Sequence, residues 1–348
     1  MDNASPANPL HTATIIPTCL PEHPAVLSAV QSLADATTKH DGIAPLSEQF
    51  LLGLADPRLG HQHYVVQSVE GTGQATVKDS AHSSDFSTGS VWGVAAFDGD
   101  SAELFVGAEF RRQGIGEQLY LTLQNDQPKS VAVWAHGNLP PAVNMAKKLK
   151  LEVTRHLLVM SVKGQCLSNA AEVENPRGEY VIENLSRSST RWGTEYVQEQ
   201  WLTVNNEAFS WHPEQGGWDA ERLQRAMETQ WFDPEGVLLL WDASEATVSN
   251  ASRPALAGFH WTKQEKDGSS KNPSVDAVGE VYVIGLANSY RGRKLGDSLM
   301  RAGLRHLLNQ GVGEVILYVE ADNEPAVKAY ERLGFAVREN HVVYAPKS

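Results

Sequence analysis

Two short basic segments combine arginine, glycine and a helix start in a pattern that suits phosphate binding. The first reads Arg111-Arg112-Gln113-Gly114-Ile115-Gly116, and the second reads Arg291-Gly292-Arg293-Lys294-Leu295-Gly296. Each follows a predicted strand and precedes a predicted helix, whose first N–H groups lack helical partners and carry a partial positive charge. Glycine lets the backbone approach a bound anion closely. The spacing therefore predicts a phosphate site at each helix start.

A basic hexapeptide alone also fits an arginine-rich helix start with no ligand. The context of the two segments argues against that alternative, because each is followed by a further predicted strand and helix. In a common register, Arg111 falls on Arg291 and Gly116 on Gly296, and Ala142-Val143 falls on Ala326-Val327. Both copies run strand, basic turn, helix, strand, helix, strand, so the chain contains two related domains.

The second copy also predicts the elements that position its basic turn. Strands are expected over 280–286 and 314–320, because these segments are rich in Val, Ile and Tyr. Asp322 or Asn323 can cap the next helix, with Pro325 in its first turn and Gly334 closing it. We expect a first domain over 1–165, a linker over 166–178 and a second domain over 179–348.

Length, charge and cysteine content bound the function. The chain has 348 residues, enough for two domains, and a net charge of -13 that disfavours a nucleic-acid partner. Two widely separated cysteines exclude a secreted disulfide scaffold and favour the cytoplasm. No segment has the pattern of a signal peptide or of a membrane span. We expect a monomeric cytoplasmic protein with a small-molecule substrate, no nucleic-acid partner and no membrane partner.

The basic turns resemble the pyrophosphate loop of GNAT acetyltransferases, which has the pattern R-x-x-G-x-G. The first copy matches fully, whereas the second has Lys294 where the family usually has glycine. The segment ADNEPAVKAYERLGF also resembles the closing segment of that family. The resemblance implies an α/β fold of two tandem GNAT domains, each a mixed sheet flanked by helices, and acetyl-CoA as the acetyl donor.

Further segments narrow the resemblance to the mycothiol synthase family. They are ATTKHDGIAPLSEQ, FSWHPEQGGWD, GFHWTK, GEVYVIGL and LYVEADN, and the resemblance covers nearly the whole chain. It implies acetyl transfer to the cysteinyl amine of cysteinyl-glucosaminyl-inositol, the last step in making mycothiol. By local motif it assigns the acceptor contacts to Glu48, Glu214, Lys263, Glu280 and Tyr318.

The resemblance also implies the catalytic and cofactor roles. Glu280 would take the proton of the amine, directly or through water, and Tyr330 would protonate the coenzyme A thiolate. The backbone beyond Glu280, where the strand splays from its neighbour, would meet the acetyl carbonyl. In the second copy the cofactor contacts would be Ile284, Gly285, Leu286, Arg291, Gly292, Arg293, Lys294, Leu295, Gly296, Asp297, Asn323, Glu324, Pro325, Ala326, Val327 and Lys328. In the first copy they would be Leu104, Phe105, Val106, Arg112, Gln113, Gly114, Ile115, Gly116 and Glu117.

Several alternatives stay open at this point. Glu280 could be a solvated residue at a strand start, Tyr330 a half-buried aromatic, and Glu48 and Lys263 ordinary surface charges. The chain could acetylate another amine, or sense acetyl-CoA without catalysis. His61 and His63 suggest a metal, but no further ligand run accompanies them, and we expect no metal site.

The two copies are expected to differ in activity. In the repeat register Ala146 stands where the second copy has Tyr330, and Asp100 falls opposite Glu280. The first copy should therefore bind acetyl-CoA without turning it over, unless its motif is an empty remnant. At Lys294, a left-handed backbone would be strained for a side chain, so we expect an ordinary helix-start conformation there.

Overall fold

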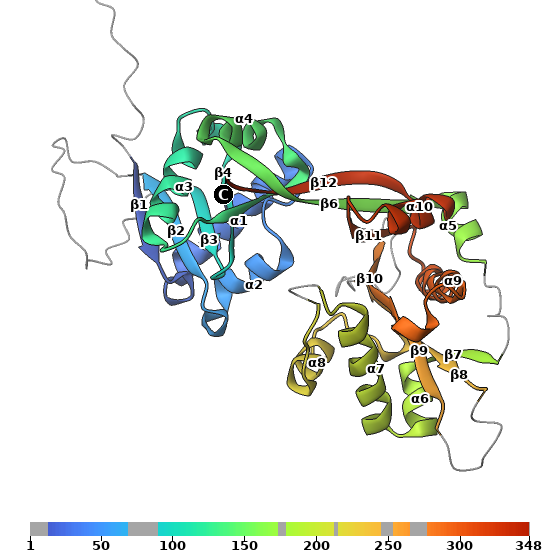
Figure 1. Ribbon diagram of the computed structural model, residues 1–348. Coiled ribbons are helices and arrows are strands. Elements are labelled where there is room, and N and C mark those ends of the chain that lie inside the picture. Colours follow the sequence, from blue (N-terminus) through green and yellow to red (C-terminus); the bar gives the residue numbers. More distant parts are fainter. Residues whose placement is uncertain are drawn as a thin grey trace, which may run out of the picture. The chain divides into compact units, whose positions relative to one another are not determined.

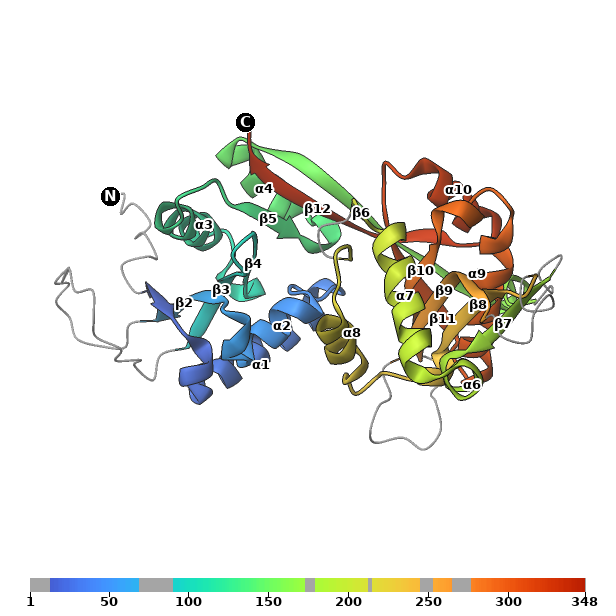
Figure 2. The ribbon, with the colours of Figure 1, turned by 60° about the horizontal axis from the view of Figure 1, so that its bottom comes forward.

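A computed structural model describes residues 13–68, 90–172, 179–211, 215–244, 253–264 and 277–347. The chain divides into two compact units (Figures 1 and 2). Unit 1 contains residues 1–157 together with 340–348, and unit 2 contains residues 158–339. None of the helices in the described ranges has an apolar stretch long enough to cross a bilayer.

Unit 1 is a sheet with helices on both faces, and its strand order is β1-β2-β3-β4-β5-β12. Alternate residues of β2 face opposite sides: Val65 packs with α1 and α2, whereas Tyr64 and Val66 pack with α3. The strands are β1 (Ala13–Thr18), β2 (Gln62–Ser68), β3 (Val91–Phe97), β4 (Ser101–Val106), β5 (Ala132–Ala135) and β12 (Ala336–Pro346). The helices are α1 (Pro24–Asp41), α2 (Glu48–Ala55), α3 (Ile115–Asp126) and α4 (Pro140–Leu149).

Unit 2 repeats this plan with the strand order β6-β11-β10-β9-β8-β7. Here Leu239 and Trp241 of β8 pack on the α7 side, and Leu240 packs on the α9 side. The strands are β6 (Leu151–Lys163), β7 (Tyr180–Asn184), β8 (Val237–Asp242), β9 (Ala255–Gln264), β10 (Val278–Leu286) and β11 (Glu314–Glu320). The helices are α5 (Gly164–Ala170), α6 (Leu185–Trp192), α7 (Thr194–Ala208), α8 (Ala220–Met227), α9 (Leu295–Asn309) and α10 (Glu324–Arg332).

The repeat inferred from the sequence is present in the fold. In unit 1, β4 leads through a short 3-10 turn to α3, β5 and α4; in unit 2, β10 leads through the same kind of turn to α9, β11 and α10. The predicted strands at 280–286 and 314–320 are β10 and β11, and Asn323 caps α10 as predicted.

The compact units do not divide the chain at the expected linker. The first residues of that linker, up to Ala170, belong to the helix α5, and residues 173–178 lie outside the described ranges. Instead β6 and β12 are long strands, each with residues in both units. Val342–Tyr344 of β12 pair with Val133–Ala135 of β5, so the end of the chain completes the sheet of unit 1.

His61 and His63, the pair that suggested a metal, are buried in unit 1. His63 is 2% exposed and accepts a 3.4 Å hydrogen bond from the Leu20 N–H, and His61 packs beside it. In unit 2, His260 is fully buried, with Nδ1 3.1 Å from the Leu299 carbonyl. Burial lowers the pKa of His63 and of His260 to about 4. These imidazoles are core groups that stay neutral.

Acidification should therefore destabilise the protein well above the range of its carboxylates. The unfolded histidines bind a proton near pH 6.5 and the folded ones only near 4, so stability is complete above 6.5 and falls as pH drops through this window. Within this window each histidine should lower the free energy of unfolding by about 1.4 kcal/mol per pH unit. Urea unfolding between pH 7.5 and 4.5 measures this. A free energy of unfolding that stays constant between pH 6.5 and 5 would contradict it.

Candidate active site

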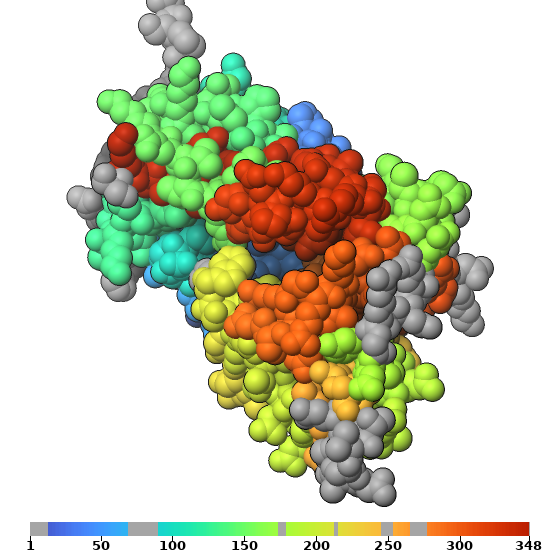
Figure 3. Space-filling model, turned by 45° about the vertical axis from the view of Figure 1, so that its right-hand side comes forward, coloured from blue at the N-terminus to red at the C-terminus, as the bar shows by residue number. Residues whose placement is uncertain are grey.

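Strands β10 and β11 separate part-way along unit 2. Their parallel pairing covers Val278–Val281 and Glu314–Leu317, and within the described strands the residues beyond, 282–286 and 318–320, are outside this ladder. Backbone N–H groups alternate between the two sides of a strand, so some of those on 282–286 point into the gap. In the space-filling view the surface around α10 and that around β10 and α9 lie on one face of unit 2 with a furrow between them (Figure 3).

A β-bulge re-aims β10 immediately before the gap. In the antiparallel pairing with β9, Val281 faces Thr262 and Val283 faces Trp261, so Tyr282 is the additional residue. One pair earlier, Glu280 faces Lys263. Directly opposed residues present their side chains on the same face, so two of the residues assigned from the sequence are brought together here.

Lys263 is 7% exposed and is not a surface charge. Its Nζ lies 5.1 Å from the ring centre of Trp231 and 6.0 Å from that of Tyr282. The two rings meet edge to face with centroids 4.8 Å apart. Aromatic faces attract an ammonium, and the attraction strengthens away from water. Lys263, the last residue of the segment GFHWTK, is therefore a buried cation opposite Glu280. Both residues are among those assigned to the acceptor from the sequence.

Tyr330 lies at the same end of the strands. Its ring packs against the core cluster that contains Val281 and Leu317, the last ladder pair before the gap, and Ile284 packs against that cluster too. Burial raises the pKa of the Tyr330 hydroxyl, so the group keeps its proton at neutral pH. Among the described residues no protein group is hydrogen-bonded to this hydroxyl. It is available as a proton donor.

On the face of β9 that carries Lys263, Trp261 packs in one buried cluster with Trp201 of α7 and with Trp218, and Gln215 lies beside them. Gln215 and Trp218 belong to the segment HPEQGGW, which the sequence marked for its composition. Glu214 of that segment lies outside the described residues. Tyr318, on β11 beyond the ladder, is 47% exposed. Glu48 is the exposed first residue of α2, in unit 1.

The two basic turns share one backbone plan with the residue types exchanged. Each turn has left-handed backbone at two positions, Arg112 (φ 64°) and Gly114 (φ 83°) in unit 1, and Gly292 (φ 76°) and Lys294 (φ 61°) in unit 2. The expectation of an ordinary helix-start conformation at Lys294 is therefore wrong. The turn needs that conformation to direct successive N–H groups to one side, and lysine adopts it at some cost.

Exchanging these residue types should separate strain from ligand binding. Lys294→Gly removes the left-handed side chain, which costs about 1 kcal/mol, but also frees the unfolded chain, so the melting temperature should change little. Acetyl-CoA affinity should fall less than about tenfold, because Lys294 is exposed and acts only as a nearby charge. The matched variant Gly114→Lys reverses both effects, so its melting temperature should also change little. Complete loss of acetyl-CoA binding in Lys294→Gly would show that the ammonium is a required ligand.

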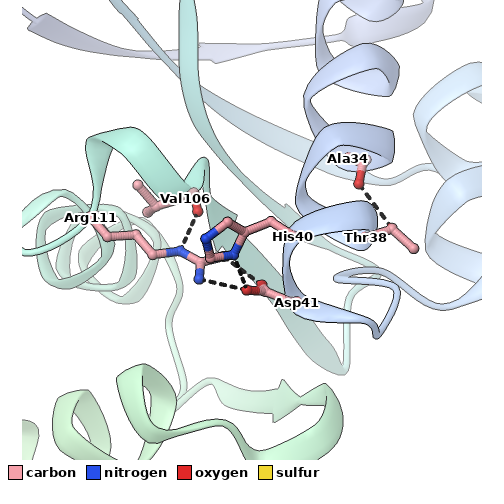
Figure 4. A network of polar contacts seen from close by, with 6 residues as sticks. All are labelled: Ala34, Thr38, His40, Asp41, Val106 and Arg111. Carbon is pink, nitrogen blue, oxygen red and sulfur yellow. Dashed lines mark hydrogen bonds and ion pairs between the residues drawn. The ribbon is translucent and has the colours of Figure 1, made fainter.

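The first arginine of each turn is tied to the last residue of an earlier helix, α1 in unit 1 and α7 in unit 2. Arg111 forms a bidentate pair with Asp41, at 2.9 and 2.6 Å, and donates from Nε to the Val106 carbonyl (Figure 4). The guanidinium holds the pKa of Asp41 below its usual range. In unit 2, Arg291 donates to the carbonyl of Ala208, the last residue of α7. Both arginines fix the turn on the scaffold, which leaves the backbone of the turn to meet a ligand.

The other expected cofactor residues lie around the same features. Gly296 and Gly116 occupy the second position of α9 and α3, where an added Cβ would meet only Leu286 at 3.7 Å in the first case and Met145, Val106 and Leu104 at 3.3–4.0 Å in the second. Residues 104–106 follow the last β4–β5 pair, Glu103 with Trp134, so unit 1 has a similar gap. Residues 323–328 form the start of α10, where Lys328 and Glu324 pair at 2.7 Å.

Unit 1 holds a buried polar chain that the sequence did not reveal. Glu103 is 2% exposed, accepts from the Ser47 N–H at 2.7 Å, and lies at an ion-pair distance of 3.0 Å from His136 Nε2, without the alignment of a hydrogen bond. His136 Nδ1 is 2.7 Å from His341 Nδ1. These groups come from four separate segments, so no local spacing announces them. Ser47 and His136 thus contact both carboxylate oxygens of Glu103, which lies at the last pair before the gap in unit 1.

In the part of unit 1 that the structure describes, the position equivalent to Tyr330 carries no hydroxyl. Ala146 is buried in α4, whose described residues include no hydroxyl. The nearby tyrosine hydroxyls are engaged, since Tyr344 donates to Asn138 Oδ1 at 2.8 Å and Tyr120 donates to the Val131 carbonyl. Asp100 lies in the tight turn between β3 and β4, where its N–H bonds Asp98. Among the described residues, no group of three or more His, Cys, Asp or Glu side chains is placed to hold a metal ion.

Comparison with known proteins agrees with this architecture. The sequence model of the acetyltransferase (GNAT) family matches residues 199–335. A mycothiol acetyltransferase of Corynebacterium aurimucosum is 48% identical over 326 residues, which cover 94% of this chain and 97% of the relative. The mycothiol acetyltransferase of Corynebacterium diphtheriae is 45% identical, covering 93% of this chain and 95% of the relative.

Solved structures confirm the expected fold. A GCN5-related N-acetyltransferase from Sphaerobacter thermophilus has a TM-score of 0.63 at 18% identity and covers 96% of this chain and 95% of its own. A tandem GNAT protein from the clavulanic acid biosynthesis pathway has a TM-score of 0.59 at 16% identity, covering 97% and 100%. At these identities the likeness concerns the fold alone, and it is the tandem GNAT fold that the two basic turns predicted.

Proposed function

The chain belongs to the mycothiol acetyltransferase family of GNAT proteins, and we propose that it transfers an acetyl group from acetyl-CoA to the cysteinyl amine of cysteinyl-glucosaminyl-inositol. The observation that carries this proposal is the end of the β10–β11 ladder. Glu280 and its partner Lys263 lie one pair before the end of this ladder, the bulge follows, and Tyr330 packs against the cluster that contains the last pair. The N–H groups of residues 282–286 suit a thioester carbonyl, and the carboxylate of Glu280 suits an amine.

The residues around the gap fit acetyl-CoA. Its pyrophosphate requires N–H groups and positive charge, which the left-handed turn before α9 and the helix start supply. Its thioester needs a donor for the carbonyl oxygen, and the N–H groups of residues 282–286 beyond the ladder offer one. Acetyl-CoA supplies the acetyl group and coenzyme A leaves as the thiolate; the proton transfers fall to side chains of unit 2.

Glu280 has the role of proton acceptor. An amine attacks a thioester only in its neutral form, so a proton must leave the ammonium before or during attack. The Glu280 carboxylate takes this proton, directly or through water. Lys263 faces it across the strands, so the carboxylate is placed on the same face of the sheet as a buried cation.

Tyr330 has the role of proton donor. When the C–S bond breaks, the sulfur carries the electron pair and needs a proton. The buried phenol, whose pKa is raised, keeps its proton until that moment and gives it to the sulfur. The new amide bond and the neutral thiol are then the products, and the phenolate regains its proton from solvent or from the proton taken by Glu280.

The acceptor is an ammonium joined to a hydroxyl-rich sugar, and we place it on the α7 side of the sheet. Glu280 and Lys263 share that face, and the packed side chains of Trp261 and Gln215 continue it. As the family resemblance implies, Glu214 and Glu48 are proposed carboxylate contacts of the ammonium, and Tyr318 is a proposed acceptor contact. Aromatic walls with a few polar groups are typical of a site that fixes one orientation of a small ligand.

Turnover with purified components tests the function and separates its rivals. The enzyme should acetylate desacetylmycothiol from acetyl-CoA, with release of one thiol per amide formed. If it instead prefers an unrelated amine by kcat/KM, it is a GNAT enzyme with another acceptor. If it binds acetyl-CoA but acetylates no amine, it is a sensor, and the roles given to Glu280 and Tyr330 are wrong.

We propose unequal work for the two halves. The first half, 1–165 by sequence, would bind acetyl-CoA in a structural site, and the second half, 179–348, would carry catalysis. Ala146 in place of Tyr330 and the engaged carboxylate of Glu103 support this division. A bound ligand stabilises a fold by mass action even when it is not turned over.

A further inference from the structure

The last turn of α7, Asn205–Ala208, contacts two separate loops of unit 2. On one side the side chain of Asn206 pairs with the backbone of one residue: its Nδ2 donates to the Trp218 carbonyl at 2.7 Å, and its Oδ1 accepts from the Trp218 N–H at 2.9 Å. Asn205 donates to the Gln215 carbonyl and accepts from Gln215 Nε2, both at 2.9 Å. The segment from Gln215 to Trp218 is thus held at both ends.

On the other side the same turn holds the approach to the phosphate-binding turn. Glu207 Oε1 accepts from the N–H of Asn288, the first residue of the 3-10 turn, at 2.8 Å. The Ala208 carbonyl accepts from Arg291 at 3.1 Å. Between these contacts the helix end packs on β10, where a Cβ added to Gly285 would lie 3.0 Å from the Ala208 Cβ.

The composition of this turn opposes helix formation. Asparagine competes with the helical backbone for hydrogen bonds, and two in succession weaken the end of α7. Yet Asn205 is 4% exposed and its amide has partners on both its oxygen and its nitrogen. A local preference overridden by a fully satisfied buried network is typical of a segment kept for its geometry.

We propose that Asn205 and Asn206 are positioning residues for the acceptor side of the reaction. They hold the segment 215–218 against Trp261 of β9, while Glu207 and the Ala208 carbonyl hold the donor side. One helical turn thereby fixes the distance between the acceptor wall and the phosphate-binding turn. The inference rests on the proposed function only in that it takes the α7 face of the sheet as the acceptor side.

Kinetics with two matched variants tests the division of labour. Asn206→Ala removes both bonds to Trp218 and should raise the KM of the amine acceptor about tenfold or more, with the KM of acetyl-CoA changed less than about twofold. Glu207→Ala should raise the KM of acetyl-CoA and leave the KM of the acceptor nearly unchanged. Glu207→Gln keeps the accepting oxygen and should therefore have the wild-type KM of acetyl-CoA. Thr203→Ala, an exposed position of the same helix, should leave both constants unchanged.

A merely structural role would raise both KM values together in both variants, and that result would overturn the proposal. If Asn206→Ala does not fold, the similarly shaped Asn206→Asp, which replaces the donating nitrogen with a carboxylate oxygen facing the Trp218 carbonyl, carries the test: an unchanged acceptor KM in it refutes the positioning role. If wild type acetylates another amine but not desacetylmycothiol, the proposed function fails. The split between the two constants can then still be measured with that amine.

Discussion

Tyr330→Phe and Glu280→Gln should each lower kcat by about 100- to 10,000-fold while leaving the dissociation constant of acetyl-CoA nearly unchanged. Phenylalanine keeps the ring that packs in the core beside Phe335 and removes only the hydroxyl. Glutamine keeps the length of Glu280 and its place opposite Lys263, and removes only the capacity to take a proton. The loss in each case is therefore chemical. Steady-state rates and acetyl-CoA titrations measure the two quantities.

A second tyrosine offers a matched control for the hydroxyl. Tyr344 of unit 1 is buried and donates one hydrogen bond to Asn138, so Tyr344→Phe should cost about 1 kcal/mol of stability and leave kcat unchanged. The pH profile adds a second check, because loss of a general base should remove the acidic limb of kcat/KM. Wild-type rates in either active-site variant would remove that residue from the mechanism.

The parts of the fold that follow from local pattern were predictable. The β-branched segment 314–320 is β11 to the residue, and Asn323 and Pro325 mark the start of α10. The turn before α9 was identified from its basic residues and glycine. In each case the residues that decide the structure are neighbours in the sequence, so a window of about ten residues contains the whole cause.

What escaped prediction depends on contacts between distant segments. The domain boundary was expected in a polar stretch, but β12 returns to pair with β5, and no local composition reports that pairing. The apolar face of α9 includes Gly303 because the His260 ring fills the space where a Cβ would be. Because glycine has no apolar side chain, the helical periodicity of the sequence does not mark Gly303 as part of the buried face.

Backbone conformation also escaped the sequence. Lysine is unfavourable in left-handed backbone, so the sequence argued that Lys294 would avoid it; the chain adopts it, because the geometry of the turn dominates a cost of about 1 kcal/mol. The partners of the site residues were equally hidden. Lys263 and Glu280 are 17 positions apart, and only the bulge at Tyr282 sets which of the residues on β10 faces the lysine.

Glutamate in place of the second glycine of each turn should separate the two acetyl-CoA sites. Gly296→Glu puts a carboxylate at the second position of α9, where the pyrophosphate would lie, and like charges this close cost several kcal/mol, about 1,000-fold in affinity. Turnover should fall with it. The backbone should tolerate the change, because φ at Gly296 is not left-handed and an added Cβ meets only Leu286, at 3.7 Å.

Gly116→Glu is the equivalent change in unit 1, at the second position of α3. An added Cβ there lies 3.3 Å from the flexible end of Met145, so the fold should adjust. Calorimetry should show about two acetyl-CoA equivalents in wild type and about one in each variant. Because unit 1 has Ala146 where unit 2 has Tyr330, and because its tyrosine hydroxyls are engaged, Gly116→Glu should keep most of the turnover. It should lose instead the stabilisation that acetyl-CoA gives unit 1, which at 100 times the dissociation constant is about 2.7 kcal/mol.

A single equivalent in wild type, unaffected by Gly116→Glu, would show that the first turn is an empty remnant. Loss of turnover in a folded Gly116→Glu protein would place the working site in the wrong half.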